Sequence, residues 1–409
     1  MDKKSDKSSL IIIFLTVFID LVGFGIIIPL SPFLARQFSA SPLEIGILMS
    51  IFSLMQFLFS PFWGRLSDKY GRRPIILMSL VGAGLSYVGF AFSNSFLLLV
   101  IMRGFAGTFS ATISTANAYI ADVTEGKDRA KGMGMIGAAF GLGFICGPLL
   151  GAGLAIVGKQ LGAEPPFGQS FASLGAALLC FLNFGFAYVK LKEPRRKSEI
   201  EKSAKEKRFK LILNHFKRPM LGALMFTFFL ASLSMALMEV MLFPYVEDRF
   251  EWGIEKASLG FAYIGVVMAF VQGYLIRKLL NKTSEKALLN IGLILMGLSL
   301  AAIPLCPNIW WLAVVMTGLA VGNGLMRPAL MGLISLNASD HEQGEVLGVS
   351  HSLSALGRII GPVIGGWMYQ SVSMGSPFVG SGILSILGFI VVLILAQKSD
   401  SEDLVTAKK

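Results

Sequence analysis

The stretch Gly64-Arg-Leu-Ser-Asp-Lys-Tyr-Gly-Arg-Arg-Pro74 decides how this chain folds. It gathers four cationic side chains around the single carboxylate of Asp68, and long apolar runs precede and follow it. Charged groups without partners are costly in the hydrocarbon of a bilayer, so a charged turn between two apolar runs belongs at a membrane surface. The stretch therefore predicts that the chain crosses a membrane on either side of it.

The composition of the 409 residues agrees, because 54% are hydrophobic and only 15% are charged. An ordinary soluble domain carries about 25% charged residues. An apolar run of about 20 residues spans a bilayer as a helix, and the chain contains twelve such runs. We therefore expect an all-α polytopic membrane protein with twelve transmembrane helices. The runs lie at 10–33, 44–63, 75–93, 96–120, 132–158, 170–189, 220–245, 257–276, 286–305, 309–335, 345–370 and 376–396.

The net charge is +11, and its distribution predicts the orientation in the membrane. Lys and Arg occur on alternate loops, with twelve of them between residues 190 and 218. The opposite loops hold only Arg36, Lys159, Arg249 and Lys256. The positive-inside rule then places both termini and the central loop in the cytoplasm. The basic excess reflects this orientation, so we expect no nucleic-acid partner, and we expect the first run to stay in the protein as a span.

The long polar stretch 190–219 divides the chain into two parts with six apolar runs each. We expect an N-terminal six-helix bundle at 1–189 and a cytoplasmic central loop at 190–219. A C-terminal six-helix bundle with a cytoplasmic tail follows at 220–409.

The two halves are related in sequence. Gly147-Pro148 in the fifth run matches Gly361-Pro362 in the eleventh, 214 residues later, and the same shift aligns Arg103-Gly104 with Thr317-Gly318. A shift shared by several pairs of runs indicates duplication, so we expect two pseudo-symmetric bundles. The charged turn does not recur, because Lys282 stands at the position that matches Asp68.

Ionisable side chains inside the runs are costly in lipid and are therefore candidates for function. Asp20 lies in the first run, Glu239 in the seventh and Arg103 in the fourth. An isolated carboxylate in hydrocarbon tends to take up a proton, because desolvation disfavours its charged form. Asp20 and Glu239 are thus candidate proton carriers, and Arg103 and Arg358 are candidates for tuning them or for contacting substrate. Alternatively, Asp20 only neutralises Arg103, and Arg327 and Arg358 cap carbonyls or face a cytoplasmic vestibule.

The fifth run is rich in glycine, at Gly143, Gly147 and Gly151, and contains Pro148. Small residues let helices approach closely in a membrane. A proline removes one backbone hydrogen bond and favours a bend. These residues predict tight helix packing.

Several of these stretches resemble one family of transporters. The charged turn resembles the loop signature of the major facilitator superfamily, G-R-x-x-D-R/K-x-G-R-R/K, which joins its second and third spans. The glycine-rich run resembles the antiporter motif of drug:proton antiporters, with Ala152 in place of the last glycine. With Asp20–Pro29, Arg103-Gly104 and Ala118–Asp122, the chain resembles the twelve-span drug:proton antiporters, with the tetracycline-efflux branch nearest. The matching residues are Gly64, Arg65, Asp68, Gly71, Arg72 and Arg73 in the turn, and Gly143, Gly147, Pro148 and Gly151 in the fifth run.

The resemblance implies the major facilitator fold, alternating access and a substrate site near the midplane between two bundles. It also implies that Asp68 lies against the N-terminal end of the eleventh helix. Arg72 would pair with Asp122, and this latch would close the cytoplasmic side and break in each cycle. The chain departs from tetracycline exporters, because Ser86 stands where they carry a carboxylate and the ninth run has no acidic residue. A lipophilic or cationic substrate is therefore expected in place of a tetracycline–magnesium chelate.

The expected function is export of small organic compounds in exchange for protons, by a transporter and not an enzyme. Two alternatives are a lipid or lysolipid transporter and a proton-independent uniporter, and a third is a receptor or scaffold on the same fold. We expect no cofactor, and no metal because the three cysteines lie far apart in the sequence. We also expect no nucleotide, because Gln160 replaces the Ser or Thr that follows Gly158-Lys159 in a phosphate-binding loop. We expect a monomer in the lipid bilayer of a bacterial inner membrane.

Overall fold

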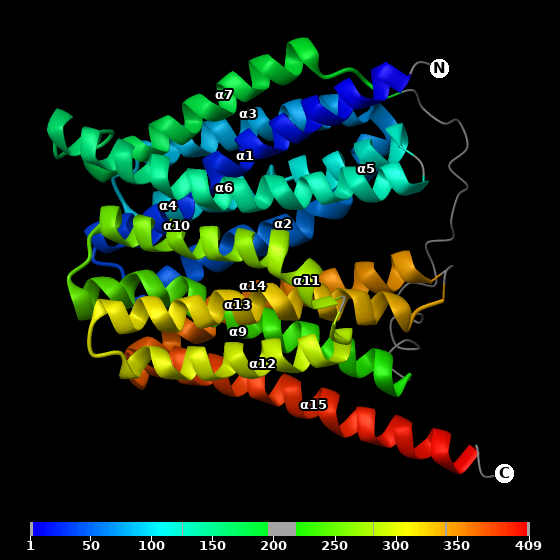
Figure 1. Ribbon diagram of the computed structural model, residues 1–409. Helices are drawn as coiled ribbons and strands as arrows, with labels where there is room; N and C mark the ends of the chain where they lie inside the picture. Colours follow the sequence, from blue (N-terminus) through cyan, green and yellow to red (C-terminus); the bar gives the residue numbers. More distant parts are fainter. Residues whose placement is uncertain (1–2, 125, 195–217, 281, 340–341, 407–409) are drawn as a thin grey trace. The chain divides into compact units, whose positions relative to one another are not determined.

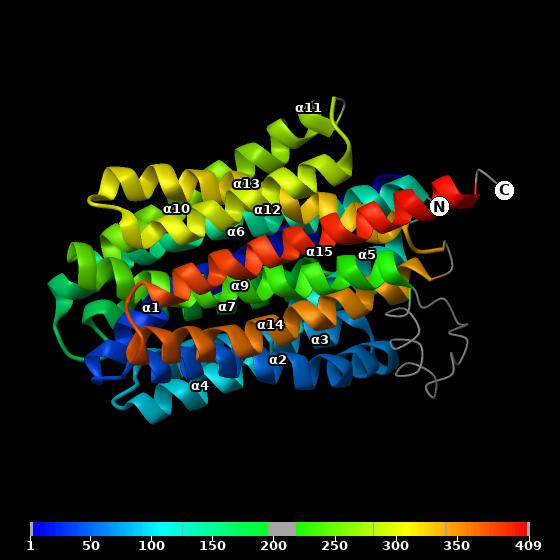
Figure 2. The same ribbon diagram turned by 90° about the horizontal axis from the view of Figure 1, so that it is seen from below.

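The computed structural model describes residues 3–124, 126–194, 218–280, 282–339 and 342–406. Within these residues, twelve helices are long and apolar enough to cross a membrane, and each overlaps one of the twelve expected runs. Figures 1 and 2 show these helices from two sides. The expected all-α class with twelve membrane-spanning helices is confirmed.

The first half of the chain forms six spans. The second and third spans meet at Gly71, and a short 3-10 helix precedes the sixth. The elements are α1 (Lys3–Gln37), α2 (Pro42–Tyr70), α3 (Arg72–Ala91), α4 (Phe96–Thr108), α5 (Thr112–Val123), α6 (Gly126–Leu161), η1 (Gly168–Ser170) and α7 (Phe171–Lys190).

The second half repeats the six spans. Its second span contains a π-helical turn, η2, and its third ends in a 3-10 turn, η3. The elements are α9 (Pro219–Phe250), α10 (Ile254–Phe270), η2 (Val271–Leu275), α11 (Ile276–Leu280), α12 (Glu285–Ala302), η3 (Ile303–Leu305), α13 (Ile309–Leu336), α14 (Gln343–Ser371) and α15 (Ser376–Thr406).

The chain packs as two compact units. The first unit comprises Met1–Ile200 and Phe243–Val266, and the second comprises Glu201–Leu242 and Val267–Lys409. The last turns of α9 and most of α10 therefore pack with the first half of the chain. Most of the expected central loop lies outside the described residues, and the division at 190–219 stays a prediction.

Glycines bring α1 and α6 into close contact inside the first unit. A Cβ atom added at Gly147 would lie 2.7 Å from the Cα atom of Gly25, and one added at Gly25 would lie 2.8 Å from the carbonyl oxygen of Gly143. Gly151 packs against Ile26 in the next turn of the helix. The expected tight packing of the fifth span is confirmed, and it places α6 along α1.

The second unit repeats this contact between α14 and α9. A Cβ atom added at Gly361 would lie 2.6 Å from Cβ of Ala236, and Gly357 and Gly365 meet the α9 backbone in the turns before and after. Each of the three glycines stands 214 residues after its counterpart in α6. The two halves thus share one way of packing their first and fifth spans.

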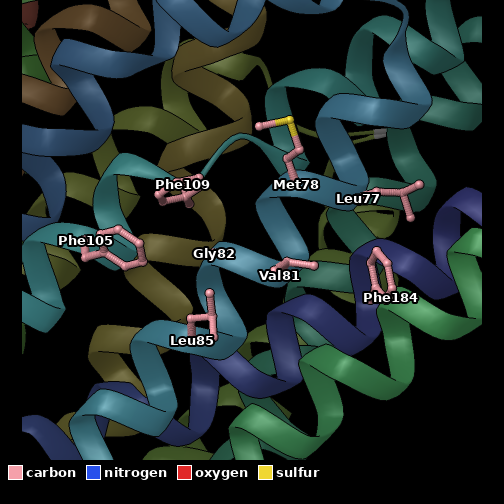
Figure 3. A pocket seen from close by; sticks show the side chains of 8 residues that line it. All are labelled: Leu77, Met78, Val81, Gly82, Leu85, Phe105, Phe109 and Phe184. Carbon is pink, nitrogen blue, oxygen red and sulfur yellow. The ribbon is translucent and has the colours of Figure 1, made fainter.

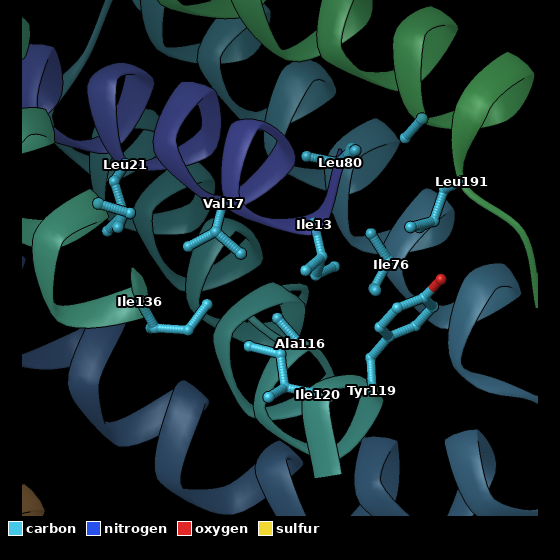
Figure 4. Packing of buried hydrophobic residues seen from close by; sticks show 12 residues of the cluster. Ile13, Val17, Leu21, Ile76, Leu80, Ala116, Tyr119, Ile120, Ile136 and Leu191 are labelled. Carbon is cyan, nitrogen blue, oxygen red and sulfur yellow. The ribbon is translucent and has the colours of Figure 1, made fainter. Parts of the chain in front are cut away.

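A buried apolar cluster joins α1, α3, α5 and α6 (Figure 4). Tyr119 of this cluster donates a hydrogen bond from its hydroxyl group to the carbonyl oxygen of Lys192, at 2.9 Å. Leu191 packs into the same cluster. The first residues after α7 are therefore fixed to the first unit.

The fourth span departs from the expected continuous helix over 96–120. α4 ends at Thr108 and α5 begins at Thr112, so residues 109–111 interrupt the helix. The hydropathy of the run does not reveal this break, at which polar side chains of other helices bond the interrupted segment.

Candidate functional site

Asp20 lies on α1, inside the first span and facing the break in the fourth. Its carboxyl group lies close to the hydroxyl of Thr112, the first residue of α5. Tyr87 on α3 and Cys180 on α7 lie nearby, and both are buried. Groups from α3, α5 and α7 are therefore neighbours of this carboxyl group.

Arg103 on α4 is buried, with 2% of its surface exposed. Its guanidinium carbon lies 4.7 Å from the ring centre of Phe52 and 5.7 Å from that of Phe24, which allows cation–π contact with both rings. Among the residues that the structure describes, Nε and Nη1 of Arg103 have no hydrogen-bond partner. No ion pair joins Arg103 to Asp20 in this part of the chain, so the simple neutralisation of one by the other is not seen.

Ser79 on α3 holds the break in the fourth span. Its hydroxyl group donates to the carbonyl oxygen of Phe109, and its oxygen accepts from the backbone nitrogen of Ala111 and from the hydroxyl of Thr112, both at 3.0 Å. Free backbone groups are costly in lipid, because no water is there to bond them. Ser79 thus adds bonds to those that the segment makes within itself, such as that from the Ala111 nitrogen to the Phe109 carbonyl at 2.8 Å.

Side chains of α2 bind the other side of the break. The indole nitrogen of Trp63 donates to the carbonyl oxygen of Thr108, and the amide nitrogen of Gln56 donates to the hydroxyl of Ser110 at 2.8 Å. Sequence reasoning missed Ser79, Thr112, Gln56 and Trp63 as site residues. The available signal was the polar cluster Thr108-Phe-Ser-Ala-Thr112 inside an apolar run.

Glu239 has different surroundings in the second unit. Its carboxylate is half-buried and interacts electrostatically with Arg358 and Arg327, whose side chains are exposed. His351 on α14 lies near the same two arginines, and its ring contacts that of Phe228 edge-on at 6.1 Å. The structure therefore brings together the predicted residues Glu239 and Arg358 and adds Arg327 to them.

The charged turn centres on Arg72, whose side chain is only 14% exposed. Its Nη1 atom donates to Oδ1 of Asp68 at 2.6 Å and to the hydroxyl of Ser67 at 2.7 Å, and its Nε atom donates to Oδ2 of Asp122 at 2.8 Å. The pairing of Arg72 with Asp122 that the family resemblance implied is present. Its action as a gate, and the place of Asp68 against the eleventh helix, stay predictions.

Glu193 completes the turn, and sequence reasoning missed it. Its carboxylate accepts hydrogen bonds from the backbone nitrogens of Arg72 at 2.6 Å and Arg73 at 2.9 Å, at the N-terminal end of α3 where a negative charge is favoured. Gly71 has φ 106°, and a Cβ atom there would lie 2.6 Å from this carboxylate. Glycine is thus required at this position both by backbone conformation and by space.

The remaining residues of the turn have simpler contacts. Arg73 donates from Nη2 to the carbonyl oxygen of Tyr188 at 2.7 Å, and its guanidinium carbon lies 5.2 Å from the centre of that ring. Arg65 donates from Nε to the carbonyl oxygen of Pro61 at 3.2 Å. A Cβ atom at Gly64 would meet nothing within 4 Å among the described residues, so packing does not explain this glycine.

Ion pairs tie the far ends of the first unit's helices. Arg36, at the end of α1, bonds both carboxylate oxygens of Asp248 and lies 3.4 Å from Glu247. Lys159, at the end of α6, pairs with Glu255 at the start of α10. Arg36 and Lys159 are two of the four cations on the loops predicted to lie outside the cytoplasm. Both therefore form ion pairs with carboxylates from the second half of the chain.

An apolar pocket of about 310 Å³ lies beside the break (Figure 3). Phe109, from the break itself, lines it, and a Cβ atom at Gly82 would overlap the Phe109 ring. Its walls offer no charged group. In the described part of the chain, no cluster of three or more potential metal ligands occurs either. The lining residues are Leu77, Met78, Val81, Gly82, Leu85, Phe105, Phe109 and Phe184.

Comparison with known proteins settles the family. The family model of the Major Facilitator Superfamily matches residues 13–289 and 278–409. The chain belongs to the major facilitator superfamily. It is 30% identical to the tetracycline resistance protein of class H from Pasteurella multocida, over 95% of each chain. It is 27% identical to multidrug resistance protein 2 of Bacillus subtilis (strain 168), over 96% of each chain.

A solved structure shows the same fold. The crystal structure of a bacterial homolog to the human lysosomal transporter Spinster, inward-facing and occupied, matches with a TM-score of 0.77 and 17% identity, over 97% of this chain and 96% of that chain. The expected fold of two pseudo-symmetric six-helix bundles is therefore confirmed. This chain is an integral membrane transporter of the major facilitator superfamily, and the expectation that it is not an enzyme agrees with this family.

Proposed function

We propose that this major facilitator protein exports lipophilic or cationic small molecules from a bacterial cell in exchange for protons. The observation that carries the proposal is Asp20. This carboxyl group lies inside a span, next to the neutral hydroxyl of Thr112, and has no ion pair within the described residues. Such a group is neutralised either by a proton or by a cationic substrate, and this competition couples the two flows. Relatives named as tetracycline and multidrug resistance proteins support the direction of transport.

The same proposal assigns a role to the second carboxylate. Glu239 lies with Arg327 and Arg358, which compensate its charge, so it suits binding of a polar or charged part of the substrate. The buried cation Arg103, with two nitrogens lacking partners among the described residues, is a contact for an anionic or carbonyl group. Asp20 would then carry the proton, while Glu239, Arg103 and Arg358 hold substrate.

The serine at position 86, where tetracycline exporters carry a carboxylate, supports the proposed substrate class. Ser86, which stands where tetracycline exporters carry a carboxylate, donates its hydroxyl to the carbonyl oxygen of Gly82 at 2.7 Å. Its hydroxyl proton is used within its own helix and is not offered to a ligand. This supports a more apolar substrate than a metal chelate.

Alternating access would use the charged groups at both ends of the spans. The pairs of Arg72 with Asp68 and Asp122 form a cytoplasmic latch in this proposal, and Arg36 with Asp248 forms an outer one. The protein works as a monomer in the inner membrane, with both termini in the cytoplasm.

The test is proton release by purified protein in weakly buffered detergent. Lipophilic cations, weak acids and lysolipids are added to the wild type and to the variants Asp20→Asn and Glu239→Gln. We expect release with a lipophilic cation, lost in Asp20→Asn and kept at higher ligand concentration in Glu239→Gln. A ligand that binds without proton release in the wild type overturns the antiport mechanism and favours uniport or lipid transport.

A further inference from the structure

The apolar pocket beside the break opens at the surface of the third span (Figure 3). Met78 and Leu85, two of its lining residues, are exposed. The polar side chains of Ser79 and Ser86 on the same helix are buried instead. An exposed apolar surface inside a membrane span meets lipid tails, because water finds no polar partner there. The pocket is therefore a recess that is open to lipid.

A recess of about 310 Å³ in this place does not stay empty. Its walls would lose dispersion contacts, since a void offers them no atoms to touch. Water does not fill it, because each buried water needs polar partners and every side chain that lines the pocket is apolar. The occupant is thus hydrocarbon, which the bilayer supplies as acyl chains.

A cation lies one helical turn from the pocket, on the side of the charged turn. Arg73 of α3 stacks on the ring of Tyr188 of α7, with its guanidinium carbon 5.2 Å from the ring centre. Leu77 follows Arg73 by four residues, Phe184 precedes Tyr188 by four, and both line the pocket. The ring centres of Phe184 and Tyr188 are 6.0 Å apart. The seam between α3 and α7 therefore leads from Arg73 directly into the pocket.

The spacing along α3 matches that of a phospholipid. At a rise of about 1.5 Å per residue, Leu77 lies about 6 Å and Leu85 about 18 Å along the helix from Arg73. The headgroup layer on each side of a bilayer is about 5–8 Å thick, and the hydrocarbon of one leaflet is about 15 Å thick. With Arg73 at the level of the headgroups, the pocket lies in the acyl region of a single leaflet.

The guanidinium group of Arg73 has donors to offer to an anion. Its Nη2 atom donates to the Tyr188 carbonyl, and its Nε atom has no hydrogen-bond partner among the described residues. The neighbouring Arg72 differs, because Asp68 and Asp122 both pair with it. In the part of the chain that the structure describes, no carboxylate forms an ion pair with Arg73.

Two further groups set the charge at this end of the pocket. Lys190, the last residue of α7, is exposed and follows Tyr188 by two residues. Glu193 carries the opposite charge, but its carboxylate accepts from the backbone nitrogens of Arg72 and Arg73. The cations Arg73 and Lys190 thus outnumber the carboxylate, and the planar fork of an arginine matches the geometry of a phosphate group.

We propose that the pocket binds one acyl chain of an anionic phospholipid, whose phosphate group binds Arg73. This lipid is a bound component of the first unit and not a transported compound. Its chain packs against Phe109, so the lipid also supports the break in the fourth span. The inference does not depend on the proposed exchange of protons.

Trp63 is a natural reporter of the pocket. Its side chain is buried, and its ring centre lies 5.5 Å from that of Phe109. The other four tryptophans are replaced by Phe, and the protein is placed in phosphatidylcholine vesicles. The vesicles contain an equal fraction of either phosphatidylglycerol or phosphatidylcholine with brominated acyl chains, which quench indole emission at short range. The replaced residues are Trp252, Trp310, Trp311 and Trp367.

We expect brominated phosphatidylglycerol to bind about fivefold more tightly than brominated phosphatidylcholine, which is the effect of one basic side chain on an anionic lipid. Arg73→Gln should remove this preference. Arg65→Gln is the matched control and should keep it, because Arg65 belongs to the same turn but bonds the Pro61 carbonyl on α2.

A second variant tests the pocket without touching the cation. Val81→Phe fills the pocket with a ring and should remove the excess quenching by phosphatidylglycerol. Val157→Phe is its control, because Val157 is an exposed valine of α6 that does not line the pocket. If Arg73→Gln does not fold, this pair still decides the question.

Equal quenching by the two brominated lipids overturns the inference, and so does a preference that survives in Arg73→Gln or in Val81→Phe. Relief of the quenching by tetraphenylphosphonium, a lipophilic cation, also overturns it, because the pocket would then hold transported compounds. No proton gradient or transport enters this assay. Its failure therefore leaves the proposed exchange standing, and loss of proton release on drug binding would leave the lipid site standing.

Discussion

Spans four and ten occupy matching places in the repeat, yet only span four is broken. α13 runs from Ile309 to Leu336 without interruption. At the shift of 214 residues, Ser79 is matched by Leu293 and Thr112 by Met326. The two side chains that hold the break in the first half are therefore apolar in the second. In this chain the break therefore occurs together with polar residues that only the first half carries at these positions.

The two carboxylates diverge in the same way. Asp20 is matched by Ser234, which donates its hydroxyl to the Ser381 carbonyl at 2.7 Å, and Glu239 stands opposite Gly25. Asp20 lies near the neutral hydroxyl of Thr112, whereas Glu239 lies near the guanidinium groups of Arg327 and Arg358. In the proposed function, one half of the duplicated chain therefore gains and loses a proton and the other holds a charge.

The largest effect is expected when the titrating carboxyl group is removed. Asp20→Asn should abolish proton-driven transport in inverted vesicles, because asparagine cannot exchange a proton. Ser234→Ala, the change at the matching position, should keep most of the rate, since only a hydroxyl bonded to a carbonyl is lost. Equal loss in both variants would show that the halves are not specialised as described.

The next effect tests the shared glycine contact. Gly147→Ala should destabilise the protein by about 1–3 kcal/mol, because overpacking forces backbone apart. Its Cβ would meet the backbone of Val22 and Gly25, at 2.7 Å each. Gly361→Ala should cost less, because only the Ala236 Cβ atom is closer than 3 Å there. Thermal unfolding in detergent measures both.

Gly153→Ala is the control for this pair, since a Cβ atom there meets nothing within 4 Å in the described residues. It should leave the unfolding temperature unchanged or raise it. If Gly147→Ala behaves like Gly153→Ala, the close approach of α1 and α6 is not what stabilises the first unit.

The spans and the tight packing of the fifth span could be predicted from the sequence. Each depends on one kind of residue, apolar for the spans and glycine for the contact, that recurs along a run. Asp20 and Glu239 stood out for the same reason, as rare charges among apolar residues. The break and the role of Glu193 were not predicted. Ser79 acts on a segment 30 residues later, and Glu193 caps a helix that begins 121 residues earlier. Short polar side chains are common in membrane helices, so only their position in space reveals such contacts.

A smaller effect is expected at the charge-compensated carboxylate. Glu239→Gln should weaken binding of a lipophilic cation about tenfold, or about 1.4 kcal/mol, because Arg327 and Arg358 then lack their counter-charge. Equilibrium binding to the purified protein measures this loss. Unchanged affinity in Glu239→Gln would mean that this carboxylate does not hold the bound cation.

The smallest effect is expected from two exposed arginine–carboxylate pairs, one in each unit. Arg36 bonds both oxygens of Asp248, and Arg218 bonds those of Glu342 at 2.9 and 3.2 Å. Solvent-exposed pairs contribute about 0.2–1 kcal/mol and are weakened by salt. Arg36 is 25% exposed and Arg218 is 51% exposed, so the Arg36 pair should give the larger coupling in a double-mutant cycle on thermal stability.

The two pairs differ more in transport than in stability. If Arg36 and Asp248 form the outer latch, Asp248→Asn removes an interaction that must break in each cycle, and the exchange rate should change. Glu342→Gln, the matched change in the second unit, should leave that rate unaltered. An equal change in both variants would assign it to general loosening of the protein, whereas no change in either would remove the Arg36 pair from the transport cycle.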